Sequence, residues 1–545
     1  MKEEIETLTK KLVSICSVNG SDGGEKAIAD YIESYLQKIP YFRKHPDRII
    51  IQPLKDDALQ RRNVMALLLG EKDDNPHTLI WHGHMDTVGV DDYKSLKPYA
   101  FDPDALEKAL HQMTLPKEMQ ADLDSGDYLF GRGALDMKSG DAVFLVLLKH
   151  LAENVSELSG NILLSINPVE ENRHQGIIEE TPILMSLKET YHLEYVAAIN
   201  NDYTCPLYPD DPHHYVYMGT VGKLLPCFYI QGKETHVGQP FEGFDASRIA
   251  AKLVDRITLN TDFLDVYNDE YTLPPMVLKM KDLKDSYNVQ TAFDSFVYFN
   301  YLVHNEEITE TIPKFTKVAQ EILDEELDYL NTQYQKFCRL THTSYTPYTF
   351  HPKVYTFAQL KEKYLETFDH DHYSELEKIA AILNERGEDQ REIPISMVKS
   401  MLNELAINDP VIVLYFAAPY CPHNTLKDED GQEKALKDKL TQMVKNFGEK
   451  VHLDYKVLQF FPSLSDSSYI KIDDSNESIT ALQENFPAMK YLYNLDTTTM
   501  KALNIPALDF GVYGKDAHKW MERVYKPYSF EVLPQLILEA VHTLL

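Results

Sequence analysis

Side chains of the kinds that bind divalent metals follow several apolar runs of the sequence. They are His84, Asp86, Asp136, Glu170, Glu171, Asp202 and His518. Imidazoles and carboxylates together form a ligand set that borderline ions such as zinc accept. A carboxylate can bridge two ions, and such a pair polarises a carbonyl group and activates a water molecule. The residue types therefore indicate a hydrolytic centre with two metal ions.

Two short motifs carry most of this chemistry. His84 and Asp86 lie two residues apart, so on an extended backbone they point the same way, and the carboxylate can orient the imidazole toward a metal. Glu170 and Glu171 are neighbours that can face differently, so one can bind a metal while the other acts as general base. A His-Asp pair that caps a strand and a solvated Glu pair are the structural alternatives. The common position of these groups at strand ends favours a site.

The elements that must position these side chains alternate between strands and helices. Short apolar runs predict strands over residues 49–52, 64–69, 78–81, 160–167, 196–200 and 507–510. Helical spacing predicts helices over residues 3–16, 25–37, 142–151, 433–446 and 530–545. This α/β order favours a mainly parallel sheet with helices on both faces and a ligand site at its carboxyl edge. The stretch 91–127, rich in Tyr, Pro and charge, is interpreted as an irregular surface excursion.

The pattern changes near Tyr215. Residues 215–231 alternate like an antiparallel strand pair, and further elements are predicted at 246–257, 276–279, 295–303, 306–334 and 411–417. Their strand–helix–strand–strand–helix order predicts a small α+β domain of the split-βαβ, ferredoxin-like type. Residues 337–409 read as a mostly helical insertion in it. The predicted domains are a catalytic α/β domain in two parts, 1–213 and 425–545, and an inserted domain, 214–424.

Charge and composition exclude several classes of partner. The 545-residue chain has 85 acidic and 54 basic residues and a formal net charge of −31, so neither nucleic acid nor an anionic membrane surface is expected as a partner. The N-terminus lacks an apolar signal core, and no apolar run approaches the roughly 18 residues that span a bilayer. The 5 cysteines form no close pair, which fits a reducing compartment. We therefore expect a cytoplasmic protein.

The combined motifs resemble the di-zinc aminoacylase, acetylornithine deacetylase and glutamate carboxypeptidase family of metallopeptidases. They are residues 84–88, 131–138, 168–171 and 511–518, with 232–240 and 243–246 similar to the family's lid. Length and insertion are most similar to the arginine-utilisation (RocB-like) branch. The resemblance implies a zinc-exopeptidase-like catalytic domain with an inserted lid and dimerisation-type domain. It also implies a hydrolase that cleaves an amide or peptide bond of a small amino-acid-derived substrate, with a link to arginine utilisation, through a di-metal-activated water.

The same resemblance implies how two divalent ions are held. His84 and Asp202 would bind one ion, and Asp136 would bridge it to the second. Glu171 and His518 would complete the second site. Zinc is the expected metal, with cobalt or manganese as alternatives.

Further roles follow from the resemblance. Asp86 would orient His84, and Glu170 would take the proton from the water. His236, on the lid, would donate to the oxyanion, with a homodimer as the arrangement in which it reaches a neighbouring subunit's site. Asn288 opens a motif similar to the family's substrate motif.

The lid also departs from the family pattern. Gln290 and Thr291 follow Asn288-Val289 in place of an apolar residue and Pro, and Tyr301 falls where a carboxylate-binding Arg is expected. Tyr lacks the bidentate fork of Arg, which argues against a free α-carboxylate on the substrate. A non-catalytic metal-binding or regulatory protein that retains the fold is therefore the alternative to an enzyme.

Overall fold

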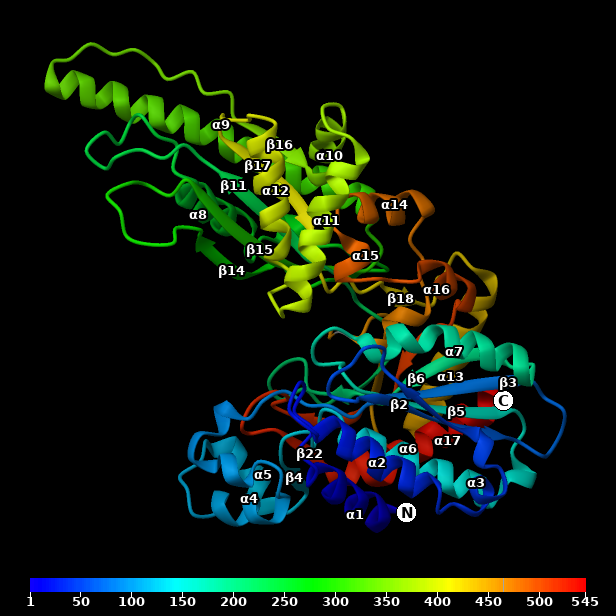
Figure 1. Ribbon diagram of the computed structural model, residues 1–545. Coiled ribbons are helices and arrows are strands. Elements are labelled where there is room, and N and C mark those ends of the chain that lie inside the picture. Colours follow the sequence, from blue (N-terminus) through cyan, green and yellow to red (C-terminus); the bar gives the residue numbers. More distant parts are fainter. Residues whose placement is uncertain (464) are drawn as a thin grey trace. The chain divides into compact units, whose positions relative to one another are not determined.

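The computed structural model describes residues 1–463 and 465–545, and this part of the chain forms two compact units (Figure 1). Unit 1 comprises Met1–Val221, His423–Ile472 and Asp496–Leu545, and unit 2 comprises Gly222–Pro422 and Asp473–Leu495. The domain boundaries predicted from the sequence did not foresee that Asp473–Leu495 returns to unit 2. As a division into functional domains, they stay a prediction.

A mixed sheet is the centre of unit 1. Its strands, in spatial order, are β1 (Ile49–Pro53), β2 (Arg62–Leu69), β5 (Asn161–Asn167), β3 (His77–His84), β6 (Glu194–Asn200), β20 (Ala507–Asp509), β8 (His214–Tyr217) and β19 (Tyr455–Leu458). The inner strands β5, β3, β6 and β20 run parallel to one another, whereas β1, β2 and β8 join antiparallel to their inner neighbours. The predicted mainly parallel, mixed α/β sheet is confirmed.

Helices cover both faces of this sheet, because successive residues of its buried strands point to opposite faces. Trp81 of β3 is fully buried and stacks on Phe144 of α6 with ring centroids 5.1 Å apart, whereas Ser165 of β5 faces Glu180 of α7 on the other side. Figure 1 shows α7 on one side of the sheet and α6 and α17 on the other. The helices of unit 1 are α1 (Lys2–Val13), α2 (Gly24–Leu36), α3 (Pro40–Lys44), α4 (Pro103–Leu110), α5 (Lys117–Ser125), α6 (Lys138–Glu153), α7 (Gln175–Tyr191), α13 (Gly431–Val451), α16 (Thr497–Leu503) and α17 (Leu533–Leu544).

Smaller strands complete unit 1. A four-stranded sheet has the order β4 (Tyr128–Phe130), β22 (Arg523–Tyr525), β21 (Val512–Lys515) and β7 (Tyr203–Thr204), and β9 (Gly219–Thr220) pairs with β18 (Asn424–Thr425). The interpretation of residues 91–127 as irregular is wrong, since α4 and α5 lie there around a buried cluster that includes Leu106 and Leu123. Proline and charge at the exposed positions concealed the short apolar periodicity.

Unit 2 contains the predicted ferredoxin-like fold. Its elements are β11 (Pro226–Gln231), α8 (Ala246–Ile257), β14 (Met276–Asp282), β15 (Asp294–Val303), α9 (Ile308–Thr341) and β17 (Val411–Phe416). These strands are antiparallel in the order β14-β15-β11-β17, which is the βαββαβ arrangement. The predicted antiparallel pair at 215–231 is wrong, because β8 belongs to the sheet of unit 1 and β11 to that of unit 2.

The predicted insertion adds one strand and several helices to unit 2. They are β16 (Lys353–Thr356), α10 (Phe357–Leu365), α11 (His370–Glu385) and α12 (Ile393–Glu404), and β16 extends the sheet by parallel pairing with β17. The remaining elements of unit 2 are β10 (Gly222–Leu224), β12 (Val266–Tyr267), β13 (Glu270–Tyr271), α14 (Asn476–Glu484) and α15 (Met489–Leu492). None of the helices in the described residues of either unit has the length and apolar character that a membrane span requires.

Candidate metal centre

The carboxyl ends of the parallel strands of unit 1 converge on one cluster of ionisable side chains. His84 is the last residue of β3, and Asp202 follows β6 by two residues. Glu170 and Glu171 follow β5, whose last residue pairs with His84 in register. Because parallel strands present their carboxyl ends at the same edge of a sheet, these side chains lie together.

Asp136, just before α6, lies between two imidazoles. Its Oδ1 is 3.1 Å from Nε2 of His84, and its Oδ2 is 2.9 Å from Nε2 of His518. Nε2 of His518 is also 3.1 Å from Oε1 of Glu171. Asp136 therefore belongs to two groups of potential ligands, one with His84 and Asp202 and the other with Glu171 and His518. Within each group, the potential ligand atoms all lie within 4.8 Å of one another. The structure thus brings together the residues that the resemblance proposed as ligands.

The electrostatics of this cluster fit divalent cations. Burial and the charge of Asp136 raise the pKa of Asp202 to about 8 and also raise the pKa of Glu171. Burial would lower the pKa of His518, but its hydrogen bonds to Asp136 and Glu171 raise it to about 11. Carboxylates that repel one another in this way become stable anions when a cation binds between them. Two imidazoles and three carboxylates are a donor set suited to zinc and to similar ions.

Asp86 contacts both of the motifs that carry potential ligands. Its Oδ1 and Oδ2 accept hydrogen bonds from the backbone N–H groups of Glu170 and Glu171, both at 3.1 Å, and Oδ2 also accepts from Nδ2 of Asn19 at 2.8 Å. Its Oδ1 lies 3.6 Å from Nδ1 of His84, whereas that nitrogen is 3.2 Å from the backbone carbonyl of Asp86. The carboxylate therefore anchors the Glu170–Glu171 turn directly and acts on His84 mainly through its charge.

Glu170 lies beside the potential ligands. One of its carboxylate oxygens is 4.0 Å from Nε2 of His84, and the other is 3.8 Å from Nδ1 of His174. His174 is hydrogen-bonded at 2.8 Å to Asp466. Glu170, His174 and Asp466 form a further group of potential ligands. Burial raises the pKa of Glu170 well above its usual value. A carboxylate with a raised pKa near the reacting atoms suits a general base.

Sequence reasoning missed the residues that support Asp136. Glu522 accepts hydrogen bonds from the backbone N–H groups of Leu135 and Asp136 at 3.1 and 3.3 Å. Its other oxygen binds the buried Arg132 guanidinium at 2.6 Å, and Arg132 also contacts Asp92. Arg132 lies inside a recognised motif, but nothing in the sequence links it to Glu522. His174 could have been noticed from its spacing of four residues from Glu170, whereas Asp466 has no local signal.

A residue of this cluster and a residue next to it have unusual backbone conformations. Val169, just before Glu170, has φ 69°, and His518 has φ 63°. Left-handed conformations are costly for non-glycine residues, above all for a β-branched one, and they concentrate at functional sites. The turns that present Glu170 and His518 are therefore held by their surroundings against the local preference of the chain.

The predicted lid residues lie in unit 2, on two segments that pair with each other. The exposed His236 forms an isolated β-bridge with Gln290, and the N–H of Val237 donates to the carbonyl of Val289 at 3.0 Å. Asn288, also exposed, bonds to Gln290. Predicted roles for His236 and Asn288 remain predictions.

Tyr301, at the position where the resemblance leads us to expect an Arg, is buried near the end of β15. Its hydroxyl donates to Glu306 and accepts from Lys314, both at 2.9 Å. The hydroxyl group of Tyr301 therefore forms hydrogen bonds with neighbouring residues of unit 2.

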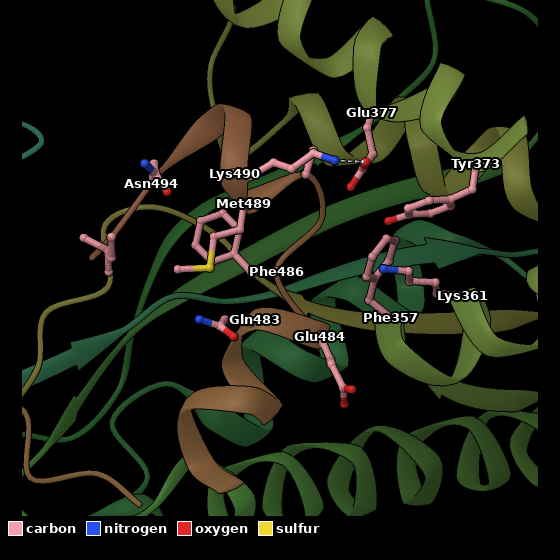
Figure 2. Close-up of a pocket in the computed structure, with 12 residues that line it drawn as sticks. Phe357, Lys361, Tyr373, Glu377, Gln483, Glu484, Phe486, Met489, Lys490 and Asn494 are labelled. Carbon is pink, nitrogen blue, oxygen red and sulfur yellow. Dashed lines mark hydrogen bonds and ion pairs between the residues drawn. The ribbon is translucent and has the colours of Figure 1, made fainter. Parts of the chain in front are cut away.

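A separate cavity in unit 2 lies between α10, α11 and the α14–α15 segment. This cavity has a volume of about 230 Å³. Phe357, Tyr373 and Phe486 are among the residues that line it, together with the Glu377–Lys490 ion pair (Figure 2). None of the described residues that line it is a histidine or a predicted site residue. The metal chemistry is therefore assigned to the cluster in unit 1.

Comparisons with known proteins agree with this assignment. Residues 80–541 match the family described as peptidase family M20/M25/M40, and the chain belongs to that family. It is 35% identical to the protein RocB of Bacillus subtilis (strain 168) over 99% of this chain and 95% of RocB. It is 24% identical to a succinyl-diaminopimelate desuccinylase of Sulfurimonas denitrificans over 59% of this chain and 74% of that protein. A tripeptidase of Staphylococcus aureus shares the fold, with 15% identity over 99% of this chain and 98% of its own and a TM-score of 0.52.

Family membership confirms three predictions. The metallopeptidase resemblance with similarity to RocB, the fold class and the nature of the protein as a hydrolase of the metallopeptidase or amidohydrolase type all agree with these matches. These matches do not identify the metal, the substrate or the roles of single residues.

The Glu522–Arg132 pair should be essential for stability. We expect Glu522→Ala to lower the free energy of unfolding of unit 1 by roughly 3 kcal/mol, because it leaves a buried guanidinium and two backbone N–H groups short of their acceptor. Urea unfolding followed by tryptophan fluorescence measures this, since Trp81 and Trp520 both lie in unit 1. Glu153→Ala, at an exposed position of α6, is the control. A loss below about 1 kcal/mol would contradict the assigned role.

Asp136 should be needed by both ions. We expect metal-loaded protein to hold about two divalent ions per chain and Asp136→Asn to hold fewer than one, because the amide cannot bridge two cations. Elemental analysis after gel filtration gives the stoichiometry, with the exposed Asp74→Asn as the matched control. Two tightly held ions in Asp136→Asn would rule out the bridging role.

Proposed function

We propose that the protein is a di-metal hydrolase that cleaves an amide or peptide bond of a small amino-acid-derived substrate. The observation that carries the proposal is the placement of the two oxygens of Asp136 against one imidazole each, with the Glu170 carboxylate beside them. His84 and Asp202 would hold one ion, and Glu171 and His518 would hold the other. Bound ions of this kind polarise a carbonyl group and activate water. Zinc is proposed, with cobalt and manganese as alternatives that elemental analysis of the purified protein distinguishes.

The proposed task of Glu170 is proton transfer. Its carboxylate is close to the ligands but can remain outside the ligand set, as the adjacent Glu171 contacts His518. Its raised pKa, which results from burial, favours uptake of a proton from the attacking water and return of that proton to the leaving amine. Asp86 fixes its position by accepting the backbone N–H of Glu170.

His236 is proposed as the donor to the oxyanion. The N–H of Gly238 donates to Nδ1 of His236 at 3.0 Å, so this nitrogen acts as an acceptor and the ring proton resides on Nε2. The exposed imidazole therefore presents an N–H donor, as an oxyanion-binding group must. A homodimer in which this residue serves the partner's site is part of the proposal.

The substrate class is the finer part of the proposal. Similarity to the RocB branch supports a substrate related to arginine, and the net charge of −31 favours a cationic compound. A screen of metal-loaded protein against N-acyl amino acids and dipeptides, with arginine and glutamate members compared, tests this choice. Turnover of an arginine compound supports it. Equal preference for glutamate compounds contradicts it, and binding without turnover favours the non-catalytic alternative.

Glu170→Gln should abolish most activity and leave the metals in place. The amide keeps the shape of the side chain but cannot take up a proton, so kcat should fall by about 10²–10⁴-fold or more. Steady-state kinetics on the best substrate of the screen and elemental analysis are the measurements. Glu189→Gln, an exposed carboxylate of α7, should behave as the parent. Loss of a metal from Glu170→Gln would make Glu170 a ligand and not the base.

His236→Ala should lower kcat by roughly 10²–10³-fold with KM and metal content nearly unchanged, because the donor acts mainly in the transition state. His370→Ala, at an exposed position of α11, is the control. Mixing His236→Ala chains with Glu170→Gln chains should regenerate active sites if the donor comes from a partner subunit. No recovery under proven subunit exchange would place His236 in its own chain's site or outside the mechanism.

A further inference from the structure

His236 lies on an exposed loop with a closed base. We call residues 233–244 the His236 loop. At its base, the N–H of Lys233 donates to the carbonyl of Phe244 and the N–H of Phe244 to the carbonyl of Lys233, both at 2.8 Å. One side of the loop pairs with residues 289–291, since the N–H of Thr291 also donates to the carbonyl of Thr235 at 2.9 Å. The other side, which carries Phe241, has no strand partner among the described residues.

Aromatic rings from a distant segment contact that other side. The ring of Phe241 packs against Tyr334 and Phe337 of α9, with centroids 5.1 and 5.2 Å apart. These residues belong to the last turns of the 34-residue α9. Figure 1 shows the chain after α9 running back along this end of the helix. We call Tyr334, Phe337, Tyr348 and Phe350 the aromatic brace.

The returning segment carries the aromatic contacts back to the base of the loop. Tyr334 packs on Tyr348 at 5.3 Å between centroids, and Tyr348 stacks on Phe350 at 5.7 Å. Phe350 then contacts Phe244 at 5.8 Å and lies under the ammonium group of Lys233 at 4.9 Å. The chain of rings thus begins at one residue of the His236 loop and ends at its base.

The brace is itself held in place. Asn331 of α9 bonds to Tyr348 twice: its Nδ2 donates to the carbonyl at 3.0 Å, and its Oδ1 accepts the backbone N–H at 2.8 Å. The returning segment is therefore fixed to the helix at the residue that stacks on both Tyr334 and Phe350. Rings held in this manner restrict a neighbouring loop at small entropic cost, since their own conformations are already limited.

We propose that the aromatic brace holds the His236 loop in one conformation and thereby positions the His236 imidazole. This inference rests on the proposed function for the role of His236, and it assigns a positioning task to the first part of the insertion. A loop with many exposed residues would otherwise sample several conformations, and a donor misplaced by about 1 Å can cost up to 10²-fold in rate.

The test removes rings at the surface of α9 and leaves the loop unchanged. The brace variant is Tyr334→Ala/Phe337→Ala, Tyr334→Phe retains the ring, and Tyr329→Ala removes an aromatic residue of the same helix that packs on Arg248 instead. Hydrogen exchange of the full chain, read in peptides covering residues 234–243, should accelerate about tenfold or more in the brace variant only. With the substrate found in the screen, kcat of the brace variant should fall about tenfold while KM and metal content are retained.

Non-additivity separates positioning from general damage. In the His236→Ala background, the brace substitutions should cause no further loss of kcat, because the group that they position is absent. Unchanged exchange in residues 234–243 overturns the inference. Faster exchange with undiminished kcat also overturns it, provided that His236→Ala alone is slow. If His236→Ala is fully active, the proposed role of that histidine fails, whereas accelerated exchange in the brace variant still supports the brace.

Discussion

The buried carboxylate of Asp136, only 6% exposed, is the constraint on which the structure of unit 1 depends. Burial would raise the pKa of this group, but hydrogen bonds from His518 and His84 keep it below its usual value. An anion at this depth needs partners on every side. Parallel strands bring one imidazole, the C-terminal segment brings the other, and Glu522 with Arg132 fixes the backbone. Much of the chain is thereby organised around one negative charge.

The sequence predicted those elements whose apolar period is long and regular. The strands that end at His84 and Asn167 and the helix after Asp136 were predicted in the right places, with ends displaced by up to about four residues, because their cores are almost purely apolar. The prediction of strand pairing at 215–231 failed because alternation reveals a strand but not its sheet. The short β19 and β16 lie at sheet edges, where half-exposed residues weaken the pattern.

The residues of the candidate site were predicted more completely than the residues that hold them in place. Ligand types such as His84 and Asp136 stand out because their motifs are local. Pairings such as Glu522 with Leu135, or His174 with Asp466, join residues hundreds of positions apart, and a single sequence contains no information on such distances. Nothing in the sequence links Phe241 to the end of α9 either, so the role of the insertion could not be inferred from the sequence.

The position of β20 has a consequence for biosynthesis. This strand, Ala507–Asp509, lies between β6 and β8, although it is synthesised long after both of them. Until then β6 has an unpaired edge, and β8 with β19 cannot join the sheet. Unit 2 has most of its residues available earlier and can collapse first. Pairing over such separations is slow, so the nascent protein leaves a strand edge open to wrong pairing until β20 is available.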